Sequence, residues 1–507
     1  MSLKRILKLF VAFLTGQGVA LVTQLLVPPM FLHSYSNGVE IYGEWLALTA
    51  AVAYLSTLNY GIQNYANNQM TIHYSRGELE RAKVVQASAL RLILIVIGTF
   101  SLLGISTLFM PLASWMGLRY VSSQQASWAL CLMVLQLAAY FLFAFLAESY
   151  MVVGEAHRGQ IWQASRILAM ALVLAFFAWR QASFLILAAS QLAVSLVWLL
   201  LCLLDVRRRA PNLLPSLRHG TREEMLAQVK PSAYFMLLAV SGFLVWQAPL
   251  LLIQKVMGPA TVTVFALSRT IFSMSRQVLV TVTFSIRQEI THLVGKQDWN
   301  GLKRLYDLSE KVVLLLTPVS TIGTLLISPL LFTVWLHKRS LFNPWMCLMM
   351  AAVSAVIAIK EHKFQFQWSS NRHEALARFN IVAYLSMLVV SVVLMRFMGL
   401  DGFLLSWLLT EIVVAIYIVH QNQKLFPGAI KISTLPFYKL FFFLAVVLPL
   451  SAWPVWHGMH WNLLQVTAVA ILGVLLLSVA AYFFFDLSDV KDVLMRRLNK
   501  KRSPAAA

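Results

Sequence analysis

Long apolar runs dominate this 507-residue sequence and restrict what it can fold into. Fourteen runs of about 20 residues, the length that a helix needs to cross the hydrocarbon core of a bilayer, are bounded by charged, Gly/Pro or polar positions. With 59% apolar and only 12% charged residues, the chain cannot cover several soluble domains. We therefore predict an all-α polytopic membrane protein with about 14 transmembrane helices. The predicted spans are residues 8–33, 40–65, 86–109, 126–151, 161–180, 182–205, 231–253, 261–285, 311–335, 344–367, 377–398, 402–422, 438–457 and 462–485.

The charge that remains is unbalanced, with 41 Lys and Arg against 20 Asp and Glu. A chain this apolar offers no folded basic face for nucleic acid, so we expect no nucleic-acid partner. Most basic residues fall on one side, in the loops or at the adjoining ends of the predicted spans, among them Lys360, Lys363 and Arg372. Because basic residues are retained in the cytoplasm, both termini are predicted to be cytoplasmic. The opposite loops hold only Arg119, Arg180, Lys255, Lys338, Arg339 and Arg396.

The longest basic loop divides the predicted spans into two groups of six and a final pair. Transporters are often built from such repeats, with the substrate path between them. We predict a six-helix lobe over 1–205, a basic cytoplasmic linker over 206–230, a second six-helix lobe over 231–422 and an extra helix pair over 438–485. Residues 486–507 are predicted to form a basic amphipathic tail on the cytoplasmic leaflet.

Two loops point to a parallel internal repeat. Arg76, Glu78 and Lys83 follow the second span, and three residues of the same charges follow the eighth span. An even number of spans separates the two loops, which requires the repeat to be parallel. The alternative is coincidence, because cytoplasmic loops before a new span commonly carry mixed charge. The matching residues are Lys296, Asp298 and Lys303.

Signals for catalysis are absent from the sequence. It contains no phosphate-binding loop of the G-x-x-x-x-G-K-[ST] type, no H-E-x-x-H and no G-x-S-x-G. Cys131, Cys202 and Cys347 are too far apart for a metal-binding pair or a disulfide framework. We expect neither enzymatic activity nor a metal or cofactor.

Arginines inside the predicted spans are the strongest functional signal, because an ionisable group at this depth needs a cavity or a partner. Arg269 lies near the middle of the eighth span, and Arg276 follows on the same helix face with Ser273 between them. The pair suits an anionic head group, because planar guanidinium groups engage two oxygens at once. Arg166 is a further candidate. The alternative is a structural ion pair with Glu411 or Glu44. The functional interpretation is favoured, because no second acidic residue is expected to lie equally deep to neutralise Arg276.

An uncharged polar stripe follows one face of the second span. Ser56, Tyr60 and Gln63 share this face, and Asn59 borders it. Such residues line a water-filled path that suits sugars, or they join helices by hydrogen bonds. The sequence leaves both interpretations open.

The sequence resembles polysaccharide and O-antigen flippases of the multidrug/oligosaccharidyl-lipid/polysaccharide exporter superfamily. The resemblance rests on the plan of six, six and two spans, on the segments Tyr42 to Leu48 and Leu58 to Gly61, and on the loop Arg76 to Glu80. It implies two lobes in a V around a central cavity, with Arg269 and Arg276 at the positions of substrate-binding arginines. It also implies a substrate other than lipid II, because the first span has no arginine after Arg5.

The implied function is alternating-access translocation of an undecaprenyl-pyrophosphate-linked oligosaccharide across the bacterial inner membrane, for surface polysaccharide or O-antigen synthesis. The partners would be the bilayer, the lipid-linked substrate, and polysaccharide polymerase and chain-length proteins. Without an ATP motif, an ion gradient or consumption of the product would drive transport, with Glu44 and Glu411 as candidate coupling carboxylates. A cation-coupled multidrug exporter of the same superfamily is the alternative function, and a membrane glycosyltransferase or O-antigen polymerase is a second alternative.

Overall fold

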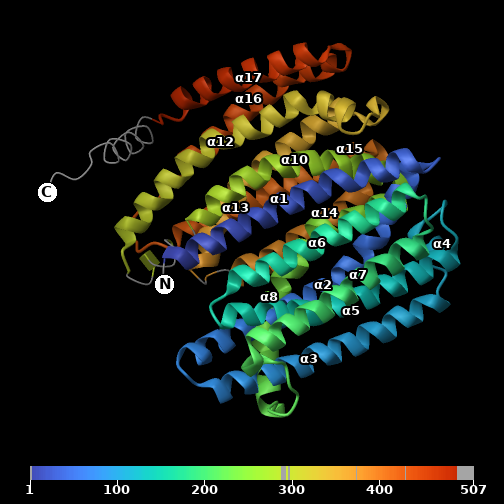
Figure 1. Ribbon diagram of the computed structural model, residues 1–507. Coiled ribbons are helices and arrows are strands. Elements are labelled where there is room, and N and C mark those ends of the chain that lie inside the picture. Colours follow the sequence, from blue (N-terminus) through green and yellow to red (C-terminus); the bar gives the residue numbers. More distant parts are fainter. Residues whose placement is uncertain are drawn as a thin grey trace. The chain divides into compact units, whose positions relative to one another are not determined.

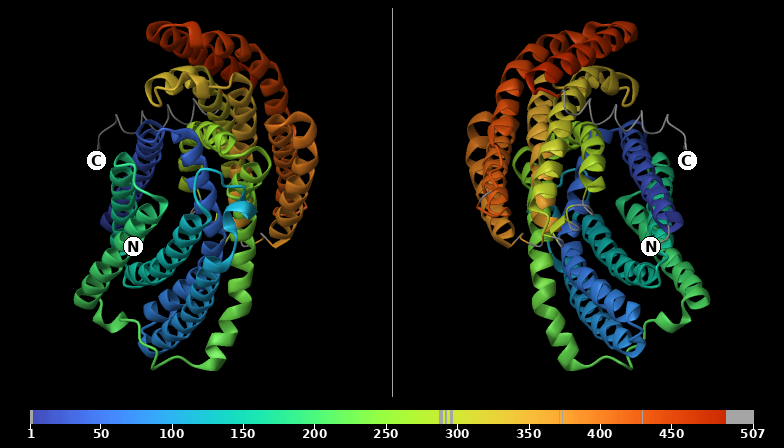
Figure 2. Two further views of the ribbon diagram at one scale, coloured as in Figure 1. Left: turned by 90° about the vertical axis from the view of Figure 1, so that its right-hand side faces the viewer. Right: turned by 90° about the vertical axis from the view of Figure 1, so that its left-hand side faces the viewer.

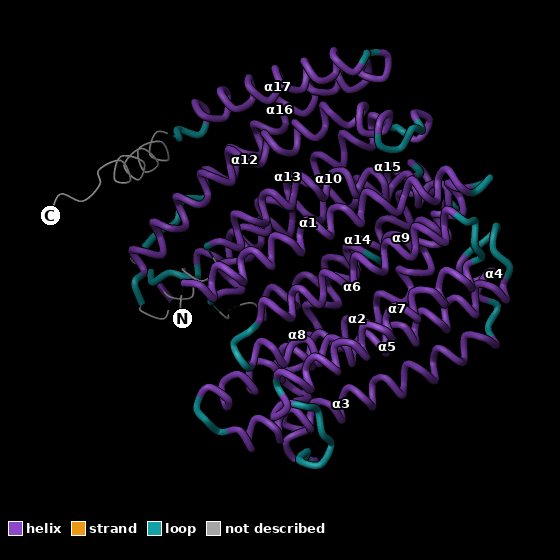
Figure 3. Tube along the Cα trace, in the orientation of Figure 1, coloured by secondary structure: helices purple, strands orange, loops and turns teal. Residues whose placement is uncertain are grey.

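The computed structural model describes residues 3–286, 290, 293–294, 297–370, 372, 374–428 and 430–487. Within these ranges the chain is built from helices joined by short loops, and no strand occurs (Figures 1 and 3). This confirms the predicted all-α class. Twelve helices of the described part are long and apolar enough to cross a membrane.

Each of the fourteen predicted spans falls on a helix. Two of these, α2 and α10, are not among the twelve that satisfy the apolarity criterion. The main helices of the first part are α1 (Leu3–Ser34), α2 (Gly38–Ser75), α3 (Leu79–Ser106), α5 (Ser123–Val152), α6 (Ala156–Trp179), α7 (Phe184–Arg209), α8 (Arg222–Trp246), α9 (Ala248–Met257) and α10 (Pro259–Ser285). They continue with α12 (Trp299–Val334), α13 (Pro344–Ser369), α14 (Glu374–Met398), α15 (Leu400–Gln423), α16 (Leu435–His457) and α17 (Leu463–Phe484).

Several helices extend beyond the predicted spans into polar sequence. The helix α8 begins nine residues before its apolar run, where the Thr221 side chain accepts a hydrogen bond from the Glu224 amide. Asp298 caps α12 in the same way, by accepting from the amide of Gly301. These caps satisfy backbone amides that the first helical turn leaves unpaired, so the helix continues where hydropathy falls. The seventh span is interrupted, because α8 ends at Trp246 and Pro249 lies in the first turn of α9.

Contacts divide the chain into two units, Met1–Thr263 and Val264–Ala507. The helices α8 and α9 pack against α2 and therefore belong to the first unit. The predicted linker 206–230 comprises the end of α7, a loop with a short 3-10 helix at Pro211–Leu213, and the start of α8. The division into transport lobes at this linker stays a prediction. Of the predicted tail, residues 488–507 lie outside the described residues.

In the first unit, α2 lies against α3, α5 and α8, while α5 packs along α7 and α1 along α6. Two glycines let α2 approach its neighbours at backbone distance. A Cβ on Gly43 would lie 1.9 Å from the carbonyl oxygen of Pro259, and one on Gly61 would lie 2.4 Å from that of Ser232. Small residues allow such approaches in membranes, where close packing has to replace the hydrophobic effect between helices.

In the second unit, α13 packs against α15 and α12, and α14 packs against α15. The last two helices, α16 and α17, form a pair alongside α12 (red in Figures 1 and 2). Phe443 of α16 meets Phe484 of α17 with ring centroids 5.3 Å apart. The predicted final helix pair is therefore packed against the second unit.

The two loops that predicted an internal repeat have the same hydrogen-bond pattern. The Glu78 amide donates to the His73 carbonyl, and 220 residues further on the Asp298 amide donates to the Leu293 carbonyl. The next turn matches as well. The Gly77 and Gln297 amides donate to the carbonyls of Tyr74 and Val294, and both residues have positive φ, 79° and 57°. Each loop then starts a long helix, α3 or α12, which supports a parallel repeat.

Candidate functional site

Four consecutive polar residues, Lys360, Glu361, His362 and Lys363, interrupt the apolar sequence of α13. Lys360 lies nine residues, or about 14 Å, before the end of this helix. Successive helical side chains point about 100° apart, so the four reach different neighbouring helices. Lys360 and Lys363, counted from sequence with the basic residues of the cytoplasmic side, lie inside the predicted span 344–367 and inside a candidate membrane span. They are accommodated there because each has a carboxylate partner on a neighbouring helix.

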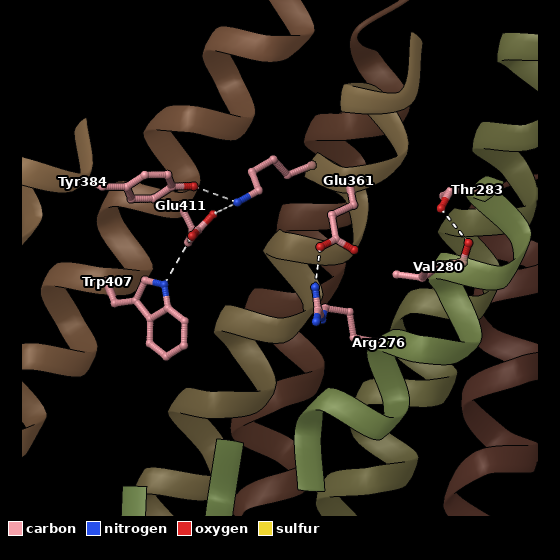
Figure 4. A network of polar contacts seen from close by, with 8 residues as sticks. Arg276, Val280, Thr283, Glu361, Tyr384, Trp407 and Glu411 are labelled. Atoms are coloured by element: carbon pink, nitrogen blue, oxygen red, sulfur yellow. Dashed lines mark hydrogen bonds and ion pairs between the residues drawn. The ribbon is translucent and has the colours of Figure 1, made fainter. Parts of the chain in front are cut away.

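Lys360 binds Glu411 of α15. Its Nζ lies 2.5 Å from Glu411 Oε2 and donates to the Tyr384 hydroxyl of α14 at 2.9 Å. Tyr384, Trp407 and Glu411 are labelled in Figure 4. Trp407 donates its indole N–H to Glu411 Oε1 at 3.2 Å. The Glu411 side chain is fully buried. It therefore acts as a satisfied structural counter-ion that joins α13 to α14 and α15.

Glu361 binds Arg276 of α10, with Arg276 Nη1 2.5 Å from Glu361 Oε1 (Figure 4). The expectation that no acidic residue lies deep enough to neutralise Arg276 is therefore wrong, because Glu361 does so. This pair is more open than the one at Lys360: both side chains are about a quarter exposed, 25% and 26%. The second carboxylate oxygen, Glu361 Oε2, has no hydrogen-bond partner among the described residues.

Lys363 binds Glu310 of α12 in the interior of the unit. Its Nζ also lies 3.9 Å from the centre of the Tyr306 ring. Between the lysines, His362 Nε2 lies 2.9 Å from the Ser309 hydroxyl. These contacts attach α13 to α12, and they are closed to solvent.

The predicted pair Arg269 and Ser273 lies on α10, within two turns of Arg276. Arg269 packs over the Phe265 ring at 5.4 Å, and Phe265 in turn contacts Phe403 and Trp407 of α15. The Ser273 hydroxyl donates to the Thr270 carbonyl of its own helix, 2.7 Å away. The sequence thus correctly placed both arginines on one helix, while Glu361, the carboxylate that binds Arg276, comes from another helix.

We call Lys360, Glu361 and Lys363, with their partners Arg276, Glu310 and Glu411, the charge cluster. Of its three ion pairs, two are buried and one is partly exposed. A buried pair is expensive to break because its ions cannot be rehydrated, whereas a partly exposed arginine exchanges one oxygen ligand for another more easily. Arg276 is therefore the cation of the cluster that is best suited to receive an outside anion.

The predicted candidates of the first unit have structural partners. Glu44 is fully buried and accepts hydrogen bonds from the backbone amides of Arg119 and Tyr120. It thereby fixes the loop that precedes α5. Gln63 donates to the Phe141 carbonyl of α5 at 3.1 Å, which favours helix joining over lining a path for this residue. The side chains of Ser56, Asn59 and Tyr60 lie outside the described part of α2.

Arg166 of α6 is buried and stacks on aromatic rings. Its guanidinium carbon lies 4.3 Å from the centre of the Tyr140 ring, and its Nη1 lies 2.8 Å from the Met170 sulfur. No carboxylate forms an ion pair with Arg166 within the described residues. Arg166 belongs to the first unit, whereas Arg269 and Arg276 belong to the second.

Sequence reasoning missed Glu361, Lys360 and Lys363. The available signal was four adjacent polar residues within the last third of a predicted span, because a stretch of that kind cannot face lipid on all sides. It also missed Glu148 on α5, which lines a pocket in the first unit. No group of three or more His, Cys, Asp or Glu in the described residues could hold a metal ion.

Solved membrane transporters share this fold. An inward-facing MATE multidrug transporter aligns with 80% of the chain and 94% of its own length, with a TM-score of 0.63 at 12% identity. A mutant of the Vibrio cholerae MATE transporter VcmN aligns with 83% and 96%, with a TM-score of 0.61 at 13% identity. The lipid II flippase MurJ, in an inward closed conformation, aligns with 97% and 100%, with a TM-score of 0.67 at 11% identity.

No protein-family model matches the sequence, and no curated protein matches it significantly. At 11–13% identity the structural likeness shows the fold alone. The chain is thus a polytopic membrane protein with the fold of MATE transporters and of MurJ. The resemblance to O-antigen flippases is consistent with this fold, and the narrower family remains a prediction.

Proposed function

We propose that this chain translocates an undecaprenyl-pyrophosphate-linked oligosaccharide across the bacterial inner membrane by alternating access, for surface polysaccharide or O-antigen synthesis. The observation that carries the proposal is the partly exposed Arg276–Glu361 pair, which joins the predicted span on α10 to the candidate membrane helix α13. A pyrophosphate offers several anionic oxygens to a guanidinium that already holds a single carboxylate oxygen. The chain would act as a transporter, with both termini cytoplasmic and with polymerase and chain-length proteins as partners.

In this mechanism the head group displaces Glu361 from Arg276. Arg269 lies seven residues earlier on α10, about 10 Å along the helix, and receives the neighbouring anionic group. Ser273 lies between them and offers a hydroxyl to a sugar or phosphate oxygen. The buried pairs Lys360–Glu411 and Lys363–Glu310 keep α13 attached to α15 and α12 during this exchange. The lipid chain stays in the bilayer.

The aligned lengths favour a flippase over a drug exporter. MATE structures align with 80–83% of this chain, whereas MurJ aligns with 97%. The part of this chain that aligns with MurJ is therefore longer than the part that aligns with the MATE transporters. MurJ is described as a flippase for lipid II, and the proposed substrate belongs to the same class of polyprenyl-pyrophosphate glycolipids.

The test is the Arg269→Ala/Arg276→Ala double variant in cells that make a surface polysaccharide. We expect glycolipid to accumulate in the inner leaflet while the amount of the protein stays normal. In spheroplasts, an added glycosidase or membrane-impermeant label should then fail to reach the glycolipid. Arg378→Ala is the matched control, because Arg378 forms an exposed pair with Glu374 at 3.6 Å near the start of α14. Normal exposure of the glycolipid in the double variant would overturn the proposal.

A multidrug exporter is the second candidate, and the MATE structures of this fold favour it. An exporter of cationic drugs would not need a deep arginine. Loss of dye efflux from cells that lack the protein, with unchanged surface glycan, would support this candidate over the flippase.

A further inference from the structure

Glu148 differs from three other carboxylates of the predicted spans, Glu44, Glu361 and Glu411. Glu44 binds backbone amides, and Glu361 and Glu411 each bind a cation. Glu148, on α5, forms neither a hydrogen bond nor an ion pair with any described residue. It lies four residues, or about 6 Å, before the predicted cytoplasmic end of this helix. An ionisable group of this kind within a membrane helix marks a functional site unless it has a partner.

Glu148 faces a pocket of about 160 Å³ between three helices of the first unit. Three amide side chains line the same pocket: Asn67 from α2, and Gln160 and Gln163 from α6. Its remaining walls are small or apolar. Gly159 lets α6 approach α5, because a Cβ there would lie 2.6 Å from the Ala147 carbonyl oxygen. The pocket is therefore formed by packed helices rather than by a surface loop.

The pocket lining suits a hard cation. Carboxylate and amide oxygens are the ligands that such ions prefer, and the volume accommodates several waters of hydration. Among the described residues no Lys, Arg or His lines the pocket, so none of these side chains neutralises Glu148. Two charged groups on the helices packed against α5 have contacts of their own: on α7, Asp205 binds Arg209 at 2.9 Å, and on α6, Arg166 stacks over Tyr140 of α5.

We propose that the Glu148 pocket binds a monovalent cation, a proton or Na⁺, from the predicted cytoplasmic side, and that its release drives the return step of transport. The coupling role rests on the proposed transport function, whereas cation binding does not. Glu148 replaces Glu44 and Glu411 as the coupling carboxylate, because both of these are buried and already bound, Glu44 to backbone amides and Glu411 to Lys360. The three amides hold the ion or its water and make the site selective for small cations.

The test measures cation binding to the purified full-length protein in nanodiscs without glycolipid. Binding of ²²Na⁺ and infrared titration of the protonated carboxyl band between about pH 5 and pH 8 are compared for the wild type and Glu148→Gln. We expect Glu148→Gln to lose both signals, or the carboxyl band alone if the cation is a proton. Gln163→Leu should weaken Na⁺ binding and keep the carboxyl band.

Glu155→Gln is the matched control. Glu155 lies seven residues after Glu148 and binds Arg158 at 2.7 Å outside the pocket, so its variant should bind cations as the wild type does. Unchanged Na⁺ binding and an unchanged carboxyl band in Glu148→Gln would overturn the proposal. That outcome would not affect the proposed translocation of glycolipid. Conversely, a protein that binds the cation but does not translocate glycolipid would overturn only the proposed function.

Discussion

Lys363 of α13 and Glu310 of α12 form an ion pair with both side chains almost completely buried, 1% and 4% exposed. Lys363 also lies over the Tyr306 ring. A buried pair of this kind does not have to stabilise the fold relative to apolar residues, but removal of one partner leaves a charge without compensation. A neutral residue at either position is therefore expected to be tolerated only when the other position is made neutral as well.

Lys363→Met should lower the free energy of unfolding by about 3–5 kcal/mol, because it leaves Glu310 buried without a cation. The double variant Glu310→Leu/Lys363→Met should recover most of this loss. Thermal unfolding in detergent measures both effects. The control is Lys303→Met, which removes a largely exposed pair with Asp307 and should cost at most about 1 kcal/mol. A double variant no more stable than Lys363→Met would contradict the expectation.

Exchange of the charges at Arg276 and Glu361 separates a binding role from a structural one. Arg276→Glu/Glu361→Arg should keep an ion pair between α10 and α13, and with it most of the thermal stability. Glycolipid exposure in spheroplasts should nevertheless be lost, because the cation has left α10. Full transport in the exchanged variant would show that Arg276 serves only to hold the helices together.

Glu361→Gln should strengthen the binding of inorganic pyrophosphate to the purified protein. The carboxylate competes with an outside anion for Arg276, and the neutral amide competes less. Calorimetric titration measures the affinity, with Glu374→Gln as a control at an exposed pair. Equal or weaker binding in Glu361→Gln would argue against displacement of Glu361 by the head group.

Glu44→Ala should destabilise the protein by about 1–3 kcal/mol, because it leaves the amides of Arg119 and Tyr120 without an acceptor. Transport per folded molecule should remain. Glu44→Gln, which keeps an acceptor oxygen, should be milder in thermal unfolding. A Glu44→Ala protein of normal stability that fails to translocate glycolipid would restore Glu44 as a coupling residue.

Gly43→Ala should lower the unfolding temperature, because its Cβ would lie 1.9 Å from the backbone oxygen of Pro259, which cannot move aside as a side chain can. Gly98→Ala on α3 is the control. A Cβ at Gly98 meets no atom within 4 Å, and alanine favours the helix by up to about 1 kcal/mol. Equal unfolding temperatures for the two variants would show that α2 moves readily away from Pro259.

The architecture could be predicted from sequence because a bilayer leaves few choices. An apolar run of about 20 residues must be helical to satisfy its backbone, whatever it packs against. For the same reason the loop repeat could be found from Glu78 and Asp298, since it depends on local hydrogen bonds. In the first of these loops His73 binds Glu78 at 2.6 Å, and this hydrogen bond lowers the pKa of the carboxyl group.

The charge cluster could not be predicted in the same way. From sequence, Lys360 and Lys363 are counted with the cytoplasmic charges although they lie within the predicted span 344–367, because an isolated charge is unfavourable in lipid. Their partners Glu411 and Glu310 come from other helices, 51 and 53 residues away. Only tertiary contacts show that the charges are neutralised. Glu148 was missed for the opposite reason, since its significance lies in having no partner among the described residues.

The charges of α13 also constrain the order in which the chain can settle in the membrane during synthesis. Glu310 precedes Lys363 in the chain. Lys363 therefore meets its counter-ion as soon as α13 has left the ribosome and lies beside α12. Glu411 follows Lys360 by 51 residues, so this second lysine must wait until α15 has been made. Until then Lys360 has no counter-ion, so transfer of α13 into the lipid is energetically unfavourable. The helices α12 to α15 therefore have to enter the bilayer as a group.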